Sequence, residues 1–281
     1  MKKLFPLLFA LTIFSPAAFS QEKNVPYGNN PANGRFYDVR GIKMYAETYG
    51  SGEPLLIIHG NGGSINNFVH QIPYFEKKYK VILADSRSQG KSLDAGDSLS
   101  YEMMADDLDA LLTAMGLDSV NVIGWSDGGI NGMLLAIRHP NKVKKLAITG
   151  ANLQPDSSAV DLGVIKLIQP EYDQLVVNKA NYEKHKTATK LMRLLVEQPH
   201  IPVASLGKIK APTLVIAGDH DVIKEEHTLL IYKSIPKAYL WILPNSGHST
   251  PVVYKDDFNM VVGRFLETPY KTFGTAESRF Y

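Results

Sequence analysis

The chain has 281 residues, with 30 Lys and Arg, 28 Asp and Glu, and no Cys. A hydrophobic fraction of 44% and a charged fraction of 21% are ordinary for a globular protein and exclude a disordered or collagen-like chain. The missing cysteines exclude a disulfide framework, thiolate catalysis and Cys-ligated zinc. A net charge of +2 gives no indication of a nucleic-acid partner.

Residues 1–20 have the three parts of a secretory signal. A basic start at Lys2 and Lys3 precedes an apolar stretch at 4–14 and small residues before Gln21. The apolar stretch is shorter than the roughly 20 residues that span a bilayer, so the pattern predicts a cleaved signal rather than a membrane anchor. Cleavage would lower the count of Lys and Arg from 30 to 28, equal to the 28 Asp and Glu. We expect a periplasmic or secreted protein with no stable membrane anchor.

Strand-like and helical patterns alternate along the rest of the chain. An Asn-, Pro- and Gly-rich stretch at 21–34 is interpreted as a linker, and 35–40 with 43–48 predict a hairpin of edge strands around Gly41. Continuous apolar runs follow, typical of strands buried on both faces of a parallel sheet. They are 55–58, 81–84, 120–123, 146–148, 214–217 and 240–243. Helical patterns fall at 101–115, 128–138, 224–234 and 251–266.

The alternation breaks once, in the interval from 152 to 207. Strand-like runs are missing there, whereas helical patterns occur at 162–168, 172–177 and 190–196. A long strandless interval inside an α/β chain is most simply an inserted helical cap. The expected organisation is therefore a core at 35–151 and 208–267, a helical cap at 152–207 and a tail at 268–281.

The clearest local motif lies at residues 124–129, which read Gly-Trp-Ser-Asp-Gly-Gly. They match G-x-S-x-G directly after an apolar strand and directly before a helix, which is the context of a nucleophile elbow. In such an elbow a strained turn exposes the serine hydroxyl at the carboxyl edge of the sheet. Ser126 is therefore the predicted nucleophile; the alternative interpretation is an ordinary glycine-rich turn.

A nucleophilic serine needs a base, and the base needs an orienting acid. On this architecture the expected chain order is Ser, Asp, His. Residues 218–221 read Gly-Asp-His-Asp after one apolar run, and 247–248 read Gly-His after the next. Both segments follow strand ends, where sheet-based sites are assembled. We predict Asp221 as the acid, with Asp219 as its alternative, and His248 as the general base.

Residues 59–63 read His-Gly-Asn-Gly-Gly after the first buried run, and their glycines would let backbone N–H groups face a substrate. We predict an oxyanion hole formed by the N–H groups of Asn61 and Asp127. Phosphate-binding patterns fail, because Ile65 replaces the last glycine of G-x-G-x-x-G and Asp85 the first glycine of a P-loop. The histidines lack zinc-ligand spacing, and we expect no metal and no organic cofactor.

Taken together, these segments resemble the α/β-hydrolase superfamily over about residues 35–266. The resemblance rests on the motifs at 59–63, 85–87, 124–129, 218–221 and 247–248. It implies an α/β-hydrolase fold, with a mostly parallel eight-stranded sheet flanked by helices and a helical cap insertion. Ser88 replaces the first glycine of the superfamily's Asp-x-Arg-Gly-x-Gly-x-Ser segment, which is structural in the family.

The motif around Ser126 looks most like that of valacyclovir-hydrolase-type esterases. In those enzymes the acid after the nucleophile has been associated with amino-ester substrates, and Asp127 matches that position. The resemblance implies a carboxylesterase-like serine hydrolase acting on a small ester or related acyl compound, and the predicted signal at 1–20 implies that it is exported. Lactonases, C–C bond hydrolases, aminopeptidases and cofactor-free haloperoxidases use the same triad and stay open as alternatives. A small-ligand-binding protein on the same fold is the non-enzymatic alternative.

Overall fold

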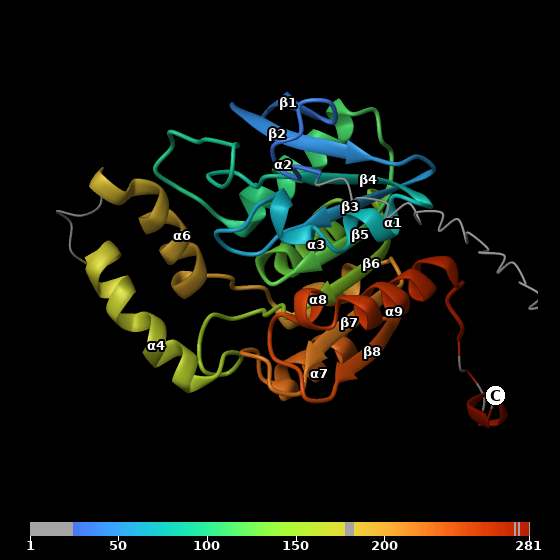
Figure 1. The fold of residues 1–281 in the computed structure, drawn as a ribbon. Helices are drawn as coiled ribbons and strands as arrows, with labels where there is room; N and C mark the ends of the chain where they lie inside the picture. The colour runs from blue at the N-terminus through green and yellow to red at the C-terminus, as the bar shows by residue number, and fades with distance from the viewer. Residues whose placement is uncertain (1–24, 178–182, 273, 275, 281) are drawn as a thin grey trace, which may run out of the picture.

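The computed structural model describes residues 25–177, 183–272, 274 and 276–280, so the predicted signal at 1–20 lies outside the described residues. A twisted eight-stranded sheet forms the centre of the molecule, in the order β1-β2-β4-β3-β5-β6-β7-β8 (Figure 1). The strands are β1 (Gly34–Val39), β2 (Ile42–Tyr49), β3 (Glu53–Ile58), β4 (Tyr79–Ala84), β5 (Val120–Trp125), β6 (Val143–Thr149), β7 (Thr213–Gly218) and β8 (Ala238–Leu243). Strand β2 pairs antiparallel with β1 and β4, and the other pairs are parallel. The predicted fold class is confirmed.

The parallel strands are buried on both faces, which explains their continuous apolar sequences. In β3, Leu56 and Ile58 belong to one hydrophobic cluster, and Leu55 and Ile57 belong to another. Successive side chains of a strand point to opposite faces, so a sheet covered on both sides needs an apolar residue at every position. Strand β8 differs, because it lies at the edge of the sheet and most of its side chains are only half-buried.

Helices cover both faces of this sheet. Helices α2, α3 and α7 supply side chains to the first cluster, and α1 and α9 to the second. Their bounds are α1 (Ile72–Phe75), α2 (Tyr101–Ala114), α3 (Asp127–Arg138), α7 (Glu225–Ser234), α8 (Thr250–Val253) and α9 (Lys255–Glu267). The sequence predicts one helix over 251–266, but the structure has α8 and α9. Tyr254 separates them with φ −113° and ψ 41°, and its hydroxyl donates to the carbonyl of Asn245 at 2.5 Å.

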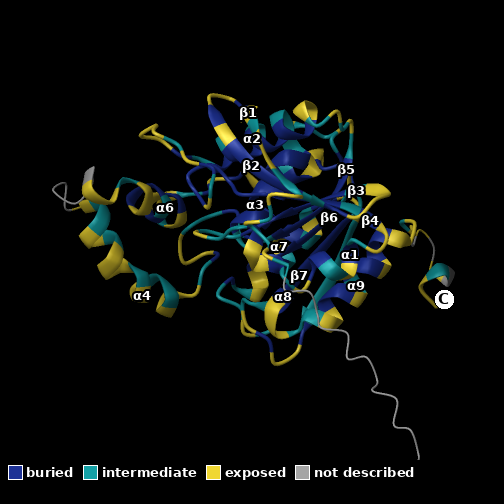
Figure 2. Cartoon of the chain, turned by 45° about the horizontal axis from the view of Figure 1, so that its top comes forward, coloured by how far each residue is buried: buried dark blue, intermediate teal, exposed yellow. Residues whose placement is uncertain are grey.

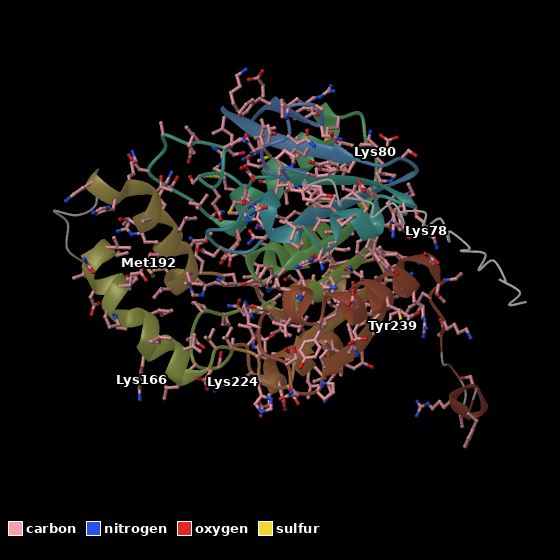
Figure 3. All side chains as sticks on the ribbon, in the orientation of Figure 1. Lys78, Lys80, Lys166, Met192, Lys224 and Tyr239 are labelled. Carbon is pink, nitrogen blue, oxygen red and sulfur yellow. The ribbon has the colours of Figure 1, made fainter. Side chains whose placement is uncertain are left out.

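In the described part of the interval between β6 and β7, the named elements are all helical. It contains α4 (Leu162–Tyr172), a π-helical turn (Asp173–Val177), a short turn (Glu183–His185), α6 (Lys186–Glu197) and a 3₁₀ segment (Val203–Lys208). Helices α4 and α6 lie side by side at one end of the molecule (Figure 1). Helix α4 has no buried residue, as its yellow and teal ribbon shows (Figure 2), and Lys166 projects from it into solvent (Figure 3). Across the part of the chain that is described, no helix is long and apolar enough to cross a membrane.

Residues 25–33, interpreted from the sequence as part of a linker, are attached to the folded body. The buried carboxylate of Glu47 in β2 accepts hydrogen bonds from two backbone N–H groups of this segment, each at 2.8 Å. The hydroxyls of Tyr45 and Tyr49 donate to the same carboxylate at 2.7 Å each. A buried charge needs such partners, so the described part of 21–34 has a fixed place on the sheet.

Candidate active site

Ser126 lies on a strained turn between β5 and α3. Its φ is +57° and its ψ is −121°, a combination that residues with a side chain rarely adopt. A Cβ at Gly124 would lie 2.2 Å from the carbonyl oxygen of Gly128, and one at Gly128 would lie 2.0 Å from that of Ile58. The two glycines therefore permit the close approach of strand and helix that exposes the serine.

Two hydrogen bonds join Ser126, His248 and Asp221. The distance from Ser126 Oγ to His248 Nε2 is 3.0 Å, and that from His248 Nδ1 to Asp221 Oδ1 is 2.7 Å. The Asp221 side chain is fully buried, whereas the imidazole of His248 is 24% exposed. The backbone N–H of Ile223 also donates to Asp221 Oδ1, at 3.1 Å. The structure thus brings together the residues predicted as nucleophile, base and acid.

Asp219, the alternative acid, lies outside this chain of hydrogen bonds. Its carboxylate accepts the backbone N–H groups of Asn245 and Ser246 at 2.8 and 2.9 Å, and it lies 2.8 Å from His220 Nδ1. The hydrogen bond with His220 and those from the two N–H groups lower the pKa of Asp219 to about 2. Asp219 therefore connects the loop after β7 to the loop after β8 that carries His248.

Two residues whose roles the sequence motifs did not indicate hold the imidazole in place. Gly150 has a φ of +62°, and a Cβ at this position would lie 2.6 Å from His248 Cε1. The indole Nε1 of Trp125 donates to the carbonyl oxygen of His248 at 2.9 Å. Gly150 directly follows β6, the strand beside β5, so a glycine at that strand end is the sequence signal that could have found it.

The side chains of Asn61 and Asp127 are hydrogen-bonded to each other. Asn61 Nδ2 donates to Asp127 Oδ2 at 2.9 Å and to the carbonyl oxygen of Leu191, in α6, at 3.2 Å. Burial raises the pKa of Asp127 to about 6, opposed by hydrogen bonds from Asn61 and Tyr101 and by the charge of His248. The two residues whose backbone N–H groups are the predicted oxyanion donors are therefore also linked through their side chains.

A cavity of about 150 Å³ opens beside Ser126. It is lined by Gly60, Asn61, Gly63, Asn67, Trp125, Ser126 and His248. Asp127 does not belong to this lining and is only 2% exposed, although it matches the position associated with amino-ester substrates. Substrate groups in this cavity would meet mainly glycine backbone, two side-chain amides and the indole.

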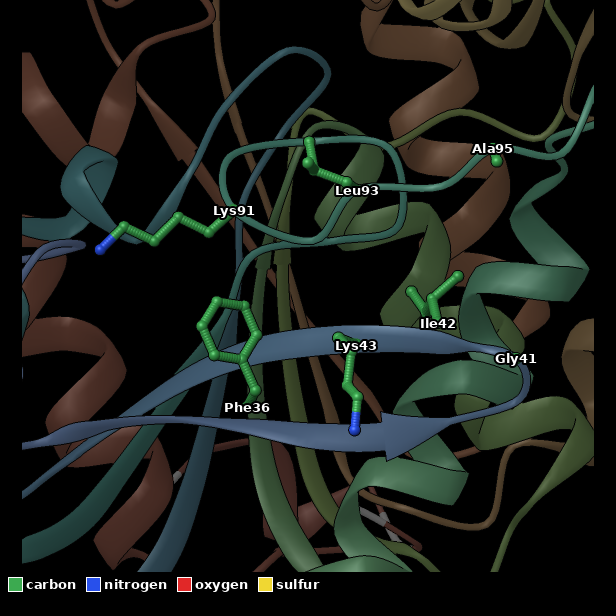
Figure 4. Close-up of a pocket in the computed structure, with 7 residues that line it drawn as sticks. All are labelled: Phe36, Gly41, Ile42, Lys43, Lys91, Leu93 and Ala95. Atoms are coloured by element: carbon green, nitrogen blue, oxygen red, sulfur yellow. The ribbon is translucent and has the colours of Figure 1, made fainter.

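A larger open groove of about 730 Å³ has a separate lining, between the β1–β2 hairpin and the loop after β4 (Figure 4). Its lining residues are Phe36, Gly41, Ile42, Lys43, Lys91, Leu93 and Ala95. None of the predicted site residues belongs to it. Within the described ranges, no group of three or more His, Cys, Asp or Glu side chains is arranged to hold a metal ion.

Fold and site together define an α/β protein whose sheet edge presents a serine, an imidazole and a carboxylate in hydrogen-bonding order. The chain belongs to the alpha/beta hydrolase fold family, whose model matches residues 53–205. It is 25% identical to the serine hydrolase BPHL of Homo sapiens over 246 residues, covering 82% of this chain and 84% of the relative.

A second relative and a solved structure are also similar to the chain. Over 261 residues the chain is 25% identical to the 2-hydroxy-6-oxononadienedioate/2-hydroxy-6-oxononatrienedioate hydrolase of Comamonas testosteroni, covering 80% of this chain and 91% of the relative. The meta-cleavage product hydrolase from Pseudomonas fluorescens has a similar structure, with a TM-score of 0.69, 19% identity and coverage of 84% of this chain and 98% of that one. The resemblance to the superfamily is confirmed, and family and relatives together support a hydrolase.

Proposed function

We propose that the protein is a serine hydrolase that cleaves a small ester or related acyl compound through an acyl-enzyme intermediate. The observation that carries this proposal is the chain of hydrogen bonds from Ser126 Oγ through His248 to Asp221, with distances of 3.0 and 2.7 Å. An imidazole held in this way can take the proton of the serine as the serine attacks a carbonyl carbon.

Each residue of the site has a defined part in this reaction. Ser126 Oγ bonds to the carbonyl carbon while its proton moves to His248 Nε2. Asp221 accepts a hydrogen bond from Nδ1–H, which keeps the Nε2 lone pair facing the serine and stabilises the imidazolium. The N–H groups of Asn61 and Asp127 bind the negative oxygen, the latter at the positive end of α3. His248 then protonates the leaving alcohol, and water releases the acyl group by the same path.

The electrostatics of the cavity favour a neutral acyl group over a dicarboxylate. The Comamonas relative is named for a dienedioate, whereas the described residues that line this cavity include no Lys or Arg. Two carboxyl groups lie next to residues that line the cavity. That of Asp221 is hydrogen-bonded to His248, and that of Asp127 is hydrogen-bonded to Asn61. Like charges repel, and the two carboxyl groups beside the cavity would meet a dianionic substrate, so C–C bond cleavage of a dicarboxylate is the weaker candidate.

Ser126→Ala tests the proposal directly. We expect the wild type to hydrolyse p-nitrophenyl acetate and to react with a fluorophosphonate probe, and the variant to do neither. His248→Ala should be comparably inactive, because the residues act as a unit. Ser98→Ala, an exposed serine outside the site, is the matched control and should retain full activity. Full labelling of the Ser126→Ala protein would overturn the proposal.

We also propose that the protein is exported and loses residues 1–20. The support is the basic, apolar and small-residue pattern of this segment. Expression of the full chain in a Gram-negative host, followed by fractionation and N-terminal sequencing, tests it. A periplasmic or medium fraction beginning at Gln21 is expected, whereas a cytosolic protein that keeps Lys2 and Lys3 would contradict export.

A further inference from the structure

The carboxamide of Asn61 uses both of its hydrogens in long-range contacts. One goes to Asp127 Oδ2 at 2.9 Å, 66 positions along the chain, and the other to the carbonyl of Leu191 at 3.2 Å, 130 positions along. The first partner directly follows Ser126, and the second lies in α6. A single side chain therefore connects the loop after β3, the nucleophile turn and the helical interval.

The loop that carries Asn61 forms a glycine-rich turn, in which the carbonyl of Gly60 accepts the N–H of Gly63 at 3.1 Å. Glycines stand at positions 60, 62 and 63, and Gly62 has a φ of +65° with nothing within 4 Å of where its Cβ would be. Glycine backbone has more conformational freedom than that of other residues. The hydrogen bonds of the Asn61 side chain thus add a restraint on the direction of its own N–H to that of the turn.

Helix α6 is held in place by a buried lysine next to Leu191. Lys190 Nζ lies 3.0 Å from Asp94 Oδ2, 3.2 Å from the Asp94 carbonyl and 2.9 Å from the Gly96 carbonyl, and the Lys190 side chain is 1% exposed. An ammonium group has three hydrogens, and all of them have acceptors here. The carbonyl of Leu191 therefore has a fixed position relative to the loop after β4.

The ion pair of Lys190 and Asp94 is connected to further buried charges in the core. The carboxylate of Asp94 also interacts with Arg87 Nη1 at 3.5 Å and with Ser88 Oγ at 3.2 Å. Arg87 in turn makes two hydrogen bonds with the buried carboxylate of Asp107 in α2, at 2.6 and 2.8 Å. Buried charges paired in this way strongly resist separation, because each partner would be left uncompensated.

We propose that Asn61 is a positioning residue for acyl transfer, and that Lys190 acts through it. The carboxamide would hold the N–H groups of Asn61 and Asp127 at the spacing that an oxyanion needs, and Lys190 would seat α6 so that Leu191 completes the tether. The inference rests on the proposed hydrolase function. Oxyanion donors act mainly as charge develops in the transition state, so disturbing their spacing should lower kcat more than it changes KM.

The first test is Asn61→Ala, which keeps the backbone N–H and removes the tether. With p-nitrophenyl acetate we expect kcat to fall about 10- to 100-fold and KM to change less than about threefold. This loss in kcat should not exceed the roughly 10²–10³-fold loss that follows removal of an oxyanion donor. Asn66→Ala, an exposed position in the short 3₁₀ turn (Ile65–Phe68) that follows this loop, is the matched control and should match the wild type.

The second test reverses the polarity of the pair. Asn61→Asp places a carboxylate against the carboxyl of Asp127 and should be more damaging than Asn61→Ala. Adding Asp127→Asn restores a donor and an acceptor between the two positions. We expect the double variant to recover kcat at least about tenfold over Asn61→Asp, which a purely structural role of Asn61 would not require.

The third test asks whether Lys190 acts through Asn61. Lys190→Met should lower kcat about three- to tenfold in the wild-type background and less than about twofold in the Asn61→Ala background, because coupled residues are non-additive. If Lys190→Met does not fold, Asp94→Asn removes the charge of its partner and gives the same comparison. Independent, multiplicative effects would overturn the part assigned to Lys190.

The two proposals fail in distinguishable ways. If the wild type shows turnover that depends on Ser126 while Asn61→Ala keeps kcat or changes KM alone, the positioning role is wrong and the hydrolase function stands. If the wild type shows no turnover that depends on Ser126, the proposed function is wrong, and the positioning role fails with it.

Discussion

Gly150 and His248 are so close that position 150 has no room for a side chain. A Cβ at Gly150 would lie 2.6 Å from His248 Cε1 and 2.8 Å from Nδ1. The same imidazole is 2.7 Å from Asp221 and 3.0 Å from Ser126. The absence of a side chain after β6 therefore defines where the imidazole can lie between its two hydrogen-bonding partners.

Gly150→Ala should accordingly abolish most activity without unfolding the protein. The added methyl would displace the imidazole, and a misplacement of about 1 Å can cost on the order of 10²-fold in rate. We expect kcat for p-nitrophenyl acetate to fall at least about 100-fold. Gly116→Ala is the control, since Gly116 has a similar φ of +69° but nothing within 4 Å of its Cβ position. Equal activity of the two variants would refute the steric argument.

Asp221→Asn and Asp219→Asn should differ widely in rate. An asparagine at 221 keeps the shape but lacks the charge that favours the productive imidazole tautomer, a change that costs about 10⁴-fold in a comparable triad. Asp219 binds loop N–H groups and His220 instead, so its variant should lose less than about tenfold. Single-turnover rates of the two purified variants test this. A larger loss of rate in Asp219→Asn than in Asp221→Asn would mean that Asp219, and not Asp221, is the acid that orients His248.

The elements and the order of the site residues follow from local sequence patterns. The run at 55–58 predicts a strand because a sheet covered on both faces needs consecutive apolar residues, and β3 has that burial. Ser126, Asp221 and His248 each follow a predicted strand. Since parallel strands end at one edge of a sheet, local sequence places their side chains in the same neighbourhood.

Contacts between distant segments have no such local signal. The bond from Asn61 to Leu191 joins residues 130 positions apart through a backbone carbonyl, which every residue possesses. Glu47 reads as a charged residue on an edge hairpin, yet tyrosines and backbone N–H groups enclose it. The amphipathic pattern of residues 251–266 is that of one continuous helix. The break at Tyr254 depends instead on the contact of its hydroxyl with the preceding loop.

Asp127 should make the stability of the protein depend on pH. Its pKa rises from 3.8 to about 6 on folding, mainly through burial, so the folded state binds this proton more tightly than the unfolded state. The associated stabilisation is fully present below pH 3.8 and is lost as pH rises through about 6, amounting to about 3 kcal/mol at order-of-magnitude precision.

Asp127→Asn should remove this component. Urea unfolding at pH 4.5 and pH 7.5 should show that the wild type loses more stability over this interval than the variant does. Asp118→Asn, which changes an exposed aspartate, should keep the wild-type pH dependence. Parallel pH profiles for the wild type and Asp127→Asn would argue against a buried, proton-binding Asp127.

Glu47→Gln should destabilise the protein and release residues 25–33 from the sheet. The carboxylate accepts four hydrogen bonds, from the N–H groups of Gly28 and Asn30 and from the hydroxyls of Tyr45 and Tyr49. A glutamine amide would present N–H groups to some of these donors and leave them unsatisfied, at a cost of about 1–3 kcal/mol for each buried group.

Urea unfolding of Glu47→Gln should show this loss of stability, and limited proteolysis should cut within 25–33. Glu53→Gln, which breaks an exposed pair with Lys144, should change stability by less than about 1 kcal/mol. Wild-type stability and protease resistance of Glu47→Gln would mean that the segment is held by other contacts.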